Sequence, residues 1–301
     1  MNATPSSSPH VSSTTARERA LVLGGGGSSG NAWSIGVLAG LFEAGLDVTG
    51  ADLVIGTSAG ATTAAQITSA PVTDLYAATL AAPPPRRPGG APGPIGSLTD
   101  HLERTNRIIE AAEDAADMRR RMGAAAIELA AASNGGSARW RETVAARLPD
   151  PRWPERAVHI TVVDAHTGEP LVLDRDSGVE LVDAVAASTA GGPAYLIGDR
   201  WYIDGGYRSV DNADLAAGYR RVLVLSPLGG RSRHPREWGT YLAAQVDELR
   251  AGGSRVETVL PDSNALDAFG ENMMDPSRRP LAARAGHDQG RALAEQLTEG
   301  W

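Results

Sequence analysis

Cysteine and lysine are both missing from this 301-residue chain, so all 28 of its Lys-plus-Arg positions are arginine. Without cysteine there is no disulfide, thiolate metal site, iron–sulfur cluster or thiol nucleophile. Without lysine there is no Walker A lysine, Schiff-base chemistry or serine–lysine hydrolase. If the chain is an enzyme, we therefore expect its nucleophile to be Ser, Thr, Asp or Glu.

Basic residues are also outnumbered by acidic ones, 28 to 36, so the formal net charge is −8 and the isoelectric point is about 5.3. An acidic surface does not attract nucleic acid, so we expect no nucleic-acid partner. No apolar run approaches the ~20 residues of a membrane span, and residues 1–18 lack the apolar stretch of a signal peptide. We expect a cytoplasmic protein with a disordered tail over residues 1–18 and one domain over residues 19–301.

Apolar segments with strand character alternate with helical patterns along the whole chain. Strands are predicted at residues 19–23, 51–55, 158–163, 170–173, 195–197, 201–203, 222–225 and 255–260. Helices are predicted at residues 31–45, 61–69, 98–133 (with a break near Gly123), 138–148, 179–188 and 237–250 and near the C-terminus. This alternation predicts an α/β fold with a mostly parallel central sheet. The Pro- and Gly-rich residues 83–96 are predicted to form a surface loop, and transient contact with a membrane surface is a second interpretation of them.

A glycine-rich loop, residues 24–30 (GGGGSSG), lies between the first predicted strand and the first predicted helix. Successive glycines let backbone N–H groups converge on one point, and the helix adds its positive end. Such a loop binds phosphate or stabilises an oxyanion. The same residues also fit the dinucleotide-binding pattern G-x-G-x-x-G, so this motif alone leaves both interpretations open.

A second motif, Gly56-Thr57-Ser58-Ala59-Gly60, directly follows a buried strand and precedes a predicted helix. This is the G-x-S-x-G pattern of the nucleophile elbow, a sharp turn that exposes a serine hydroxyl. Small flanking residues are needed because the turn is crowded. Its position after an apolar strand favours a catalytic serine over a chance match.

The third motif is Asp204-Gly205-Gly206, at the end of a predicted strand. By itself it is typical of a simple turn. In α/β-hydrolases a histidine follows the acidic residue in the chain, and the only histidines after Asp204 are His234 and His287. Neither lies in a supporting motif, so we expect both at the surface.

The order of these motifs resembles that of the patatin-like phospholipases, which carry G-G-G-x-[Arg/Lys]-G, then G-x-S-x-G, then D-G-[Gly/Ala]. The matching residues are 25–30, 56–60 and 204–206, and the resemblance covers about residues 20–226. It implies a three-layer α/β/α fold, a Ser-Asp dyad without a catalytic histidine, and no metal or organic cofactor. One departure is Ser29, which stands where the family carries Arg or Lys.

The resemblance also implies roles for individual residues. By position, Ser58 is the nucleophile and Asp204 is the base. The oxyanion hole is formed by the backbone N–H groups of four residues: Gly25, Gly26, Gly27 and Ser28. The other matched motif positions are glycines: Gly30, Gly56, Gly60, Gly205 and Gly206. The implied reaction is hydrolysis of an acyl ester, in a lipid or another hydrophobic ester, through an acyl-enzyme.

Two alternatives stay open on the sequence. A nucleotide- or dinucleotide-binding module would use the glycine-rich loop and an acidic residue after the second strand. Asp47 and Asp52 precede that strand rather than closing it, which disfavours this alternative. A relative that binds lipid without turning it over is the other alternative, suggested by Ser29.

Overall fold

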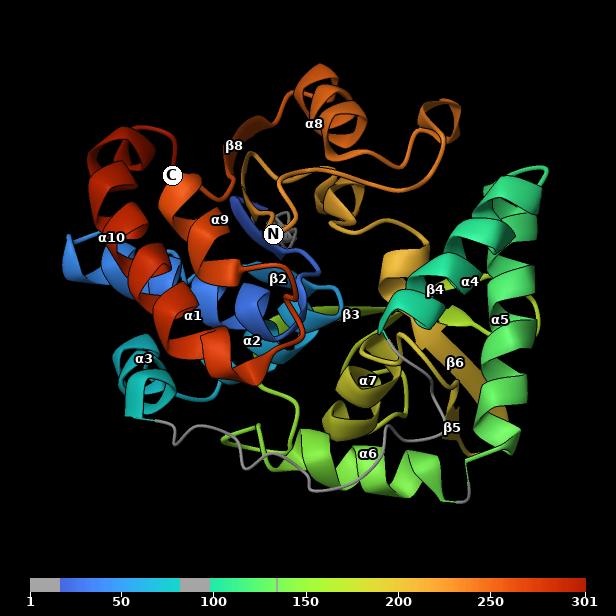
Figure 1. Cartoon of the computed structure of the whole chain (residues 1–301). Coiled ribbons are helices and arrows are strands. Elements are labelled where there is room, and N and C mark those ends of the chain that lie inside the picture. Colours follow the sequence, from blue (N-terminus) through green and yellow to red (C-terminus); the bar gives the residue numbers. More distant parts are fainter. Residues whose placement is uncertain (1–16, 82–97, 134) are drawn as a thin grey trace, which may run out of the picture.

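The computed structural model describes residues 17–81, 98–133 and 135–301, which surround one mixed β-sheet (Figure 1). Five strands are parallel, in the order β3–β2–β1–β7–β8. They are β1 Arg19–Leu23, β2 Leu53–Gly56, β3 Ala157–Asp164, β7 Arg221–Leu225 and β8 Arg255–Val259. The antiparallel strands are β4 Pro170–Leu173, β5 Tyr195–Ile197 and β6 Arg200–Asp204. The predicted mostly parallel sheet is confirmed.

Helices cover both faces of the sheet, and the alternation of side chains along β1 shows why. Leu21 and Leu23 pack in a core with α1 (Gly27–Glu43) and α10 (Arg279–Thr298). Ala20 and Val22 point to the opposite face, where they pack with α8 (Leu242–Ala251). Successive residues of a buried parallel strand face opposite layers, so the strand is apolar from Ala20 to Leu23. The three-layer α/β/α architecture is confirmed.

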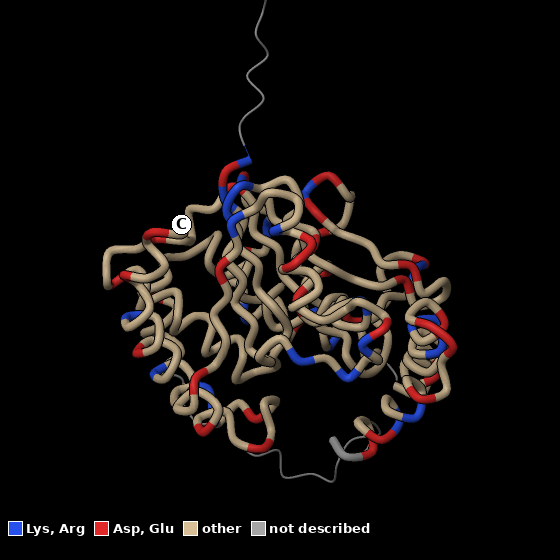
Figure 2. Tube along the Cα trace, turned by 90° about the horizontal axis from the view of Figure 1, so that it is seen from above, with Lys and Arg blue, Asp and Glu red and all other residues tan. Residues whose placement is uncertain are grey.

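The other helices complete these layers and the surface around them. They are α2 Ala59–Ile67, α3 Val72–Ala81, α4 Leu98–Ala111, α5 Ala115–Ala131, α6 Gly136–Ala145, α7 Leu181–Ser188 and α9 Ser263–Phe269. Short 3-10 turns are η1 Gly205–Tyr207, η2 Ala213–Ala216, η3 Arg236–Trp238 and η4 Pro276–Arg278. Figure 2 shows acidic and basic residues mixed along the outer helices, while the sheet at the centre is mostly uncharged.

Helices α1 and α10 are in backbone contact because small residues face each other where they cross. A Cβ atom on Gly36 would lie 2.1 Å from the Ala283 carbonyl oxygen, and one on Gly286 would lie 2.3 Å from that of Trp33. Real Cβ atoms do not approach so closely, so any larger residue would push the helices apart. The C-terminal helix is therefore held firmly against the helix that begins at the glycine-rich loop.

The helical region predicted over residues 98–133 is two helices, and their boundary differs from the glycine where a break was expected. The chain breaks before Asp114, whose side chain accepts a hydrogen bond from the Asp117 N–H and so caps α5. Gly123 lies inside α5, where a Cβ atom would approach the Ala165 carbonyl oxygen to 1.9 Å. Helix α3 was not predicted, and α1 begins four residues earlier than expected, at Gly27.

Residues 83–96, predicted as a surface loop, lie outside the described residues, as does most of the predicted tail. The tail at 1–18, the single domain over 19–301 and the cytoplasmic location therefore stay predictions. Within the described ranges, no helix is long and apolar enough to cross a membrane. The same residues contain no group of three or more His, Cys, Asp or Glu side chains arranged to hold a metal ion.

Candidate active site

The turn between β2 and α2 holds Ser58 in a strained backbone conformation, with φ of 54° and ψ of −116°. A residue other than glycine rarely adopts a positive φ. Packing requires the flanking glycines. A Cβ atom on Gly60 would lie 1.9 Å from the Leu23 carbonyl oxygen, and one on Gly56 would lie 2.6 Å from the Ala61 Cα. This sharp strand–turn–helix geometry is that of a nucleophile elbow.

Strand β3 brings the Asp204 carboxylate to the Ser58 hydroxyl. It pairs with β2 through Ile160 and Gly56, and with β6 through Val162 and Asp204. These partners on β3 are two residues apart, a separation of about 7 Å along a strand. The ends of β2 and β6 therefore meet, and the Ser58 hydroxyl lies close enough to the Asp204 carboxylate to lower its pKa.

The surroundings of Asp204 make it a stronger base than an ordinary carboxylate. Burial raises the pKa of Asp204 to about 6, because the charged form loses hydration. Two interactions limit the rise by stabilising the charged form. The Gly206 N–H donates to Asp204 Oδ1 at 2.7 Å, and the Ser58 hydroxyl also contacts the carboxylate. The group is thus ionised at neutral pH yet poised to accept a proton.

Gly30 of the first motif and Gly205 of the third occupy positions without room for a side chain. A Cβ atom on Gly30 would lie 2.9 Å from the Pro227 Cβ, and one on Gly205 would lie 2.2 Å from the Thr161 Oγ1. Gly30 thereby lets α1 approach the loop after β7. Gly205 lets the chain turn tightly after Asp204 against β3.

The glycine-rich loop lies directly beside the serine, since a Cβ atom on Gly25 would be 3.5 Å from the Ser58 Cβ. The Gly25 N–H donates to the Val210 carbonyl oxygen at 2.9 Å and is therefore engaged within the protein. The N–H groups of residues 26–28 make no hydrogen bond to the described part of the chain. Residues 27 and 28 open helix α1, whose first N–H groups have no partner within the helix.

The C-terminal segment braces the glycine-rich loop in a way that the sequence did not predict. The Arg279 guanidinium, from α10, donates to the Ser28 carbonyl oxygen at 3.1 Å and to the Asn31 Oδ1 at 2.8 Å. The Ser29 N–H donates to the Met273 carbonyl oxygen at 2.9 Å. Ser29 is fully buried and its hydroxyl has no partner within the described residues. The positive charge of Arg279 thus lies against the glycine-rich loop.

Two further side chains contact the segments that carry Ser58 and Asp204. Asn212 is fully buried with a φ of 53°, and its Nδ2 donates to the Thr57 Oγ1 at 2.9 Å and to the Ser209 carbonyl at 2.7 Å. It links the segment after Asp204 to the residue before the serine. From α7, the Ser188 hydroxyl oxygen accepts a hydrogen bond from the Ser58 N–H at 2.9 Å. Neither role was predicted from the sequence.

A second buried carboxylate, Asp211, lies behind the glycine-rich loop. It is 1 % exposed, its Oδ1 has no hydrogen-bond partner in the described part of the chain, and a Cβ atom on Gly24 would lie 2.2 Å from that oxygen. Burial raises its pKa to about 6, and a hydrogen bond with the Ser226 side chain opposes the rise. Asp211 thus explains the need for glycine at position 24.

The two histidines that follow Asp204 in the chain have partners other than Ser58 and Asp204. His287, on α10, is hydrogen-bonded to the Glu43 Oε2 at 2.6 Å through its Nε2. His234 is 7 % exposed, so its expected surface position is wrong. Its Nδ1 lies 3.0 Å from the Thr240 Oγ1. Burial lowers the pKa of His234 to about 4.

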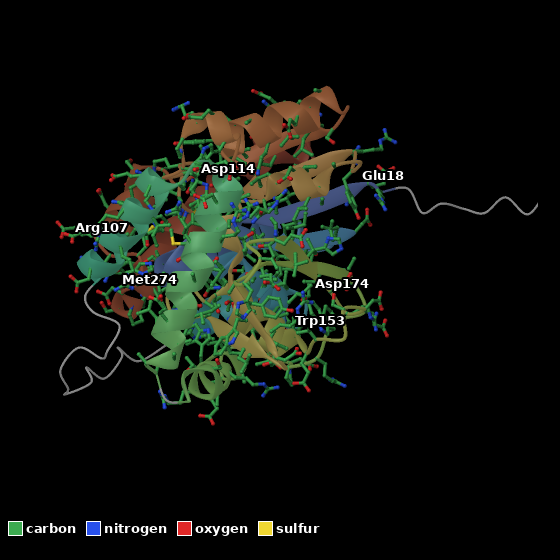
Figure 3. The ribbon with its side chains drawn as sticks, turned by 90° about the vertical axis from the view of Figure 1, so that its right-hand side faces the viewer. Glu18, Arg107, Asp114, Trp153, Asp174 and Met274 are labelled. Carbon is green, nitrogen blue, oxygen red and sulfur yellow. The ribbon has the colours of Figure 1, made fainter. Side chains whose placement is uncertain are left out.

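The site opens at the carboxyl end of the parallel strands. Figure 3 places Met274 at the opposite end of the molecule from Glu18, which immediately precedes β1. Met274 lies over the glycine-rich loop, because a Cβ atom on Gly27 would be 2.7 Å from its sulfur, and 60 % of Met274 is exposed. Ligands of open α/β sheets bind at this end of the strands.

Comparison with solved structures finds distant similarity to two proteins. VipD from Legionella pneumophila is 13 % identical, with a TM-score of 0.43, and the match covers 93 % of this chain and 67 % of VipD. The type III effector protein ExoU is 15 % identical, with a TM-score of 0.42, and the match covers 93 % of this chain and 53 % of ExoU. The chain thus spans about half the length of ExoU. No curated protein sequence matches it.

A family model gives the decisive comparison. The model described as patatin-like phospholipase matches residues 21–217, more than half of the chain. The matched region includes all three motifs. It ends before Met273 and Arg279, so the bracing of the glycine-rich loop from the C-terminal segment lies outside the family pattern. The chain belongs to the patatin-like phospholipase family.

Proposed function

We propose that the protein is a lipid acyl hydrolase in which Ser58 is the nucleophile and Asp204 is the general base. The observation that carries the proposal is the strained turn that presents the Ser58 hydroxyl beside the buried Asp204 carboxylate. Family membership supports lipid ester substrates. The test is hydrolysis of p-nitrophenyl acyl esters and phospholipids by the wild type and by the Ser58→Ala variant.

In the proposed mechanism, Asp204 takes the proton of the Ser58 hydroxyl while the Ser58 Oγ attacks the ester carbonyl carbon. The protonated Asp204 then gives that proton to the leaving alcohol, and the acyl group remains on Ser58. Water attacks this acyl-enzyme with Asp204 again as base, which releases the fatty acid. Asp204 then gives the proton taken from water to the leaving Ser58 Oγ, so the second half-reaction restores the hydroxyl and the carboxylate to their starting states.

The oxyanion of each tetrahedral intermediate is assigned to the backbone N–H groups of Gly26, Gly27 and Ser28. The Gly25 N–H, included in the sequence-based expectation, already donates to Val210, so we leave it out of the proposed oxyanion hole. Fixed donors beside the reacting atom need no reorganisation as charge develops. We therefore expect the glycine-rich loop to stabilise the oxyanion while Ser58 and Asp204 carry out the attack and the proton transfer.

The alternative of a dinucleotide-binding module finds no support in the acidic residues it requires. The Asp52 carboxylate accepts hydrogen bonds from the N–H groups of Glu18 and Arg19, at the amino end of the parallel strands. Asp47 accepts hydrogen bonds from the Thr49 backbone and hydroxyl. Both carboxylates are thus engaged away from the glycine-rich loop, where a ribose partner would be needed.

The rate is expected to fall in acid because Asp204 must be ionised to act as a base. Its pKa of about 6 means that kcat/KM is constant above that pH and falls about tenfold for each pH unit below it. The measurement is kcat/KM for p-nitrophenyl butyrate across this range, with tryptophan fluorescence to verify that the protein stays folded. A profile without an acid limb near pH 6 contradicts the assignment of Asp204.

Replacing Arg279 with alanine is expected to lower kcat about tenfold or more while KM changes little. The Ser28 carbonyl and Asn31 would lose their charged donor, and the proposed oxyanion donors would be less well fixed. Steady-state kinetics on a soluble ester measure the effect, and Arg279→Lys should restore part of it. The matched control is Arg284→Ala, an exposed arginine on the same helix. Equal kcat values for both alanine variants contradict a positioning role.

A further inference from the structure

Methionine is the only sulfur-containing residue type in this chain, because cysteine is absent. Among the methionines that the structure describes, Met118 and Met122 are buried, and Met273 is half-buried against the main core. Met274 differs from them, since 60 % of it is exposed. Peroxides convert accessible methionine to its sulfoxide, a common oxidative change in proteins. Met274 therefore carries the sulfur most open to oxidation in the described part of the chain.

The Met274 sulfur lies against the glycine-rich loop. A Cβ atom on Gly27 would be only 2.7 Å from this sulfur, so the thioether contacts the loop at that residue. Backbone hydrogen bonds fix the segment that carries the side chain. The Met274 N–H donates to the Asn272 Oδ1 at 3.0 Å, and the Met273 carbonyl oxygen accepts from the Ser29 N–H at 2.9 Å. Met274 thus projects from a segment that is tied to the loop it contacts.

The N–H groups of residues 26–28 are the ones assigned to the oxyanion, and they are unpaired in the described part of the chain. A thioether sulfur is only a weak hydrogen-bond acceptor, so unmodified Met274 leaves these donors free for the substrate. A sulfoxide is polar and carries an oxygen on the sulfur. Because unpaired donors take an available acceptor, that oxygen would hold the donors that the oxyanion needs.

We propose that Met274 is an oxidation site whose sulfoxide slows ester hydrolysis by occupying N–H groups of the glycine-rich loop. This inference rests on the proposed function and adds a way to regulate the same site. The oxidant is a peroxide. The Met274 Sδ attacks one oxygen of hydrogen peroxide, the O–O bond breaks, the S–O bond forms, and the other oxygen leaves as water. The sulfur is oxidised by two electrons, and methionine sulfoxide reductase reverses the change.

The test follows p-nitrophenyl butyrate hydrolysis and peptide masses while the full chain is exposed to hydrogen peroxide. In the wild type, kcat should fall about 10- to 100-fold, in step with the gain of one oxygen on Met274, because a single oxyanion donor contributes about 100-fold or more. Fragment ions distinguish Met274 from Met273 within their shared peptide. Treatment with methionine sulfoxide reductase should restore both the mass and the rate.

Two substitutions at position 274 separate oxidation from a mere change of side chain. Met274→Leu keeps a similar apolar volume without sulfur, so it should be active and should remain active in peroxide. Met274→Gln brings an amide oxygen close to where the sulfoxide oxygen would lie, so its kcat without peroxide should be about tenfold below that of Met274→Leu. Met273→Leu is the matched control, and peroxide should inactivate it at the wild-type rate.

Equal inactivation of the wild type and Met274→Leu overturns the proposal, because the sensitive group then lies elsewhere. Full activity in a wild type whose Met274 is completely oxidised also overturns it, as does a sulfoxide that forms first at another methionine. A wild type that is inactive before peroxide is added refutes the proposed function instead. The mass measurement does not depend on turnover, so the order of oxidation still decides whether Met274 is the modified residue.

Discussion

Replacing Ser58 with alanine is expected to lower kcat for ester hydrolysis by about 10,000-fold or more, as when the nucleophile of other serine hydrolases is removed. The Asp204 carboxylate would remain, but no hydroxyl would be left for it to deprotonate. The loss should fall on kcat with soluble and lipid substrates alike, because the acyl-enzyme forms with neither. Initial rates with p-nitrophenyl butyrate and with a phospholipid measure the effect.

The matched control for this variant is Ser69→Ala. Ser69 is an exposed serine just after α2, the helix that begins after Ser58, and its hydroxyl donates back to the Ala65 and Gln66 carbonyl oxygens. It should retain wild-type activity. Full activity in the Ser58→Ala variant would remove Ser58 as the nucleophile. A wild type that is inactive and unreactive towards a fluorophosphonate would instead favour a lipid-binding relative without turnover.

Replacing Asp204 with asparagine is expected to lower kcat by about 1,000- to 10,000-fold and, at the same time, to stabilise the folded protein at neutral pH. The amide retains the shape of the carboxylate and an oxygen for the Gly206 N–H, but it cannot accept the proton of Ser58. The gain in stability arises because a buried negative charge is removed. Activity and urea unfolding, measured on the same preparation, test the two effects together.

The sign of the stability effect follows from the direction of the pKa shift. The pKa of Asp204 is about 6 in the folded protein, above its ordinary value of 3.8. The folded state therefore holds this proton more tightly, and its stability falls as pH rises from below 4 through about 6. Above that range the penalty is at most about 3 kcal/mol. Asp204→Asn should be more stable than wild type at pH 8, and the difference should vanish below pH 4. If the difference in unfolding free energy between the variant and the wild type is the same at pH 4 and pH 8, the raised pKa of Asp204 is contradicted.

Local sequence predicted the parts of the site that depend on short-range sterics. The crowding of a strand–turn–helix junction demands glycine at positions 56 and 60, so G-x-S-x-G after an apolar strand was sufficient to indicate the turn at Ser58. The mostly parallel sheet followed from the alternation of apolar strands and helices. The proximity of Ser58 and Asp204 could be inferred only from the family resemblance. It depends on the register in which β2 and β6 each pair with β3.

The parts that were not predicted depend on contacts between distant segments. Arg279 lies about 250 positions from Ser28 in the chain, and no local pattern marks it as a partner of the glycine-rich loop. Asn212 acts through a buried amide whose partners lie on three different segments. Charged residues flank His234 in the sequence, yet its side chain is buried in the folded protein. Such packing follows from tertiary structure rather than from residue type.

The central claim, that Ser58 carries the acyl group with Asp204 as its base, is tested most directly by locating the covalent adduct. The wild type and the Asp204→Asn variant are incubated with a fluorophosphonate ester, digested, and analysed by mass spectrometry over time. We expect one adduct, on the peptide that contains Ser58, forming rapidly in the wild type and far more slowly in the variant. An adduct on another residue, or equal labelling rates in both proteins, would contradict the account.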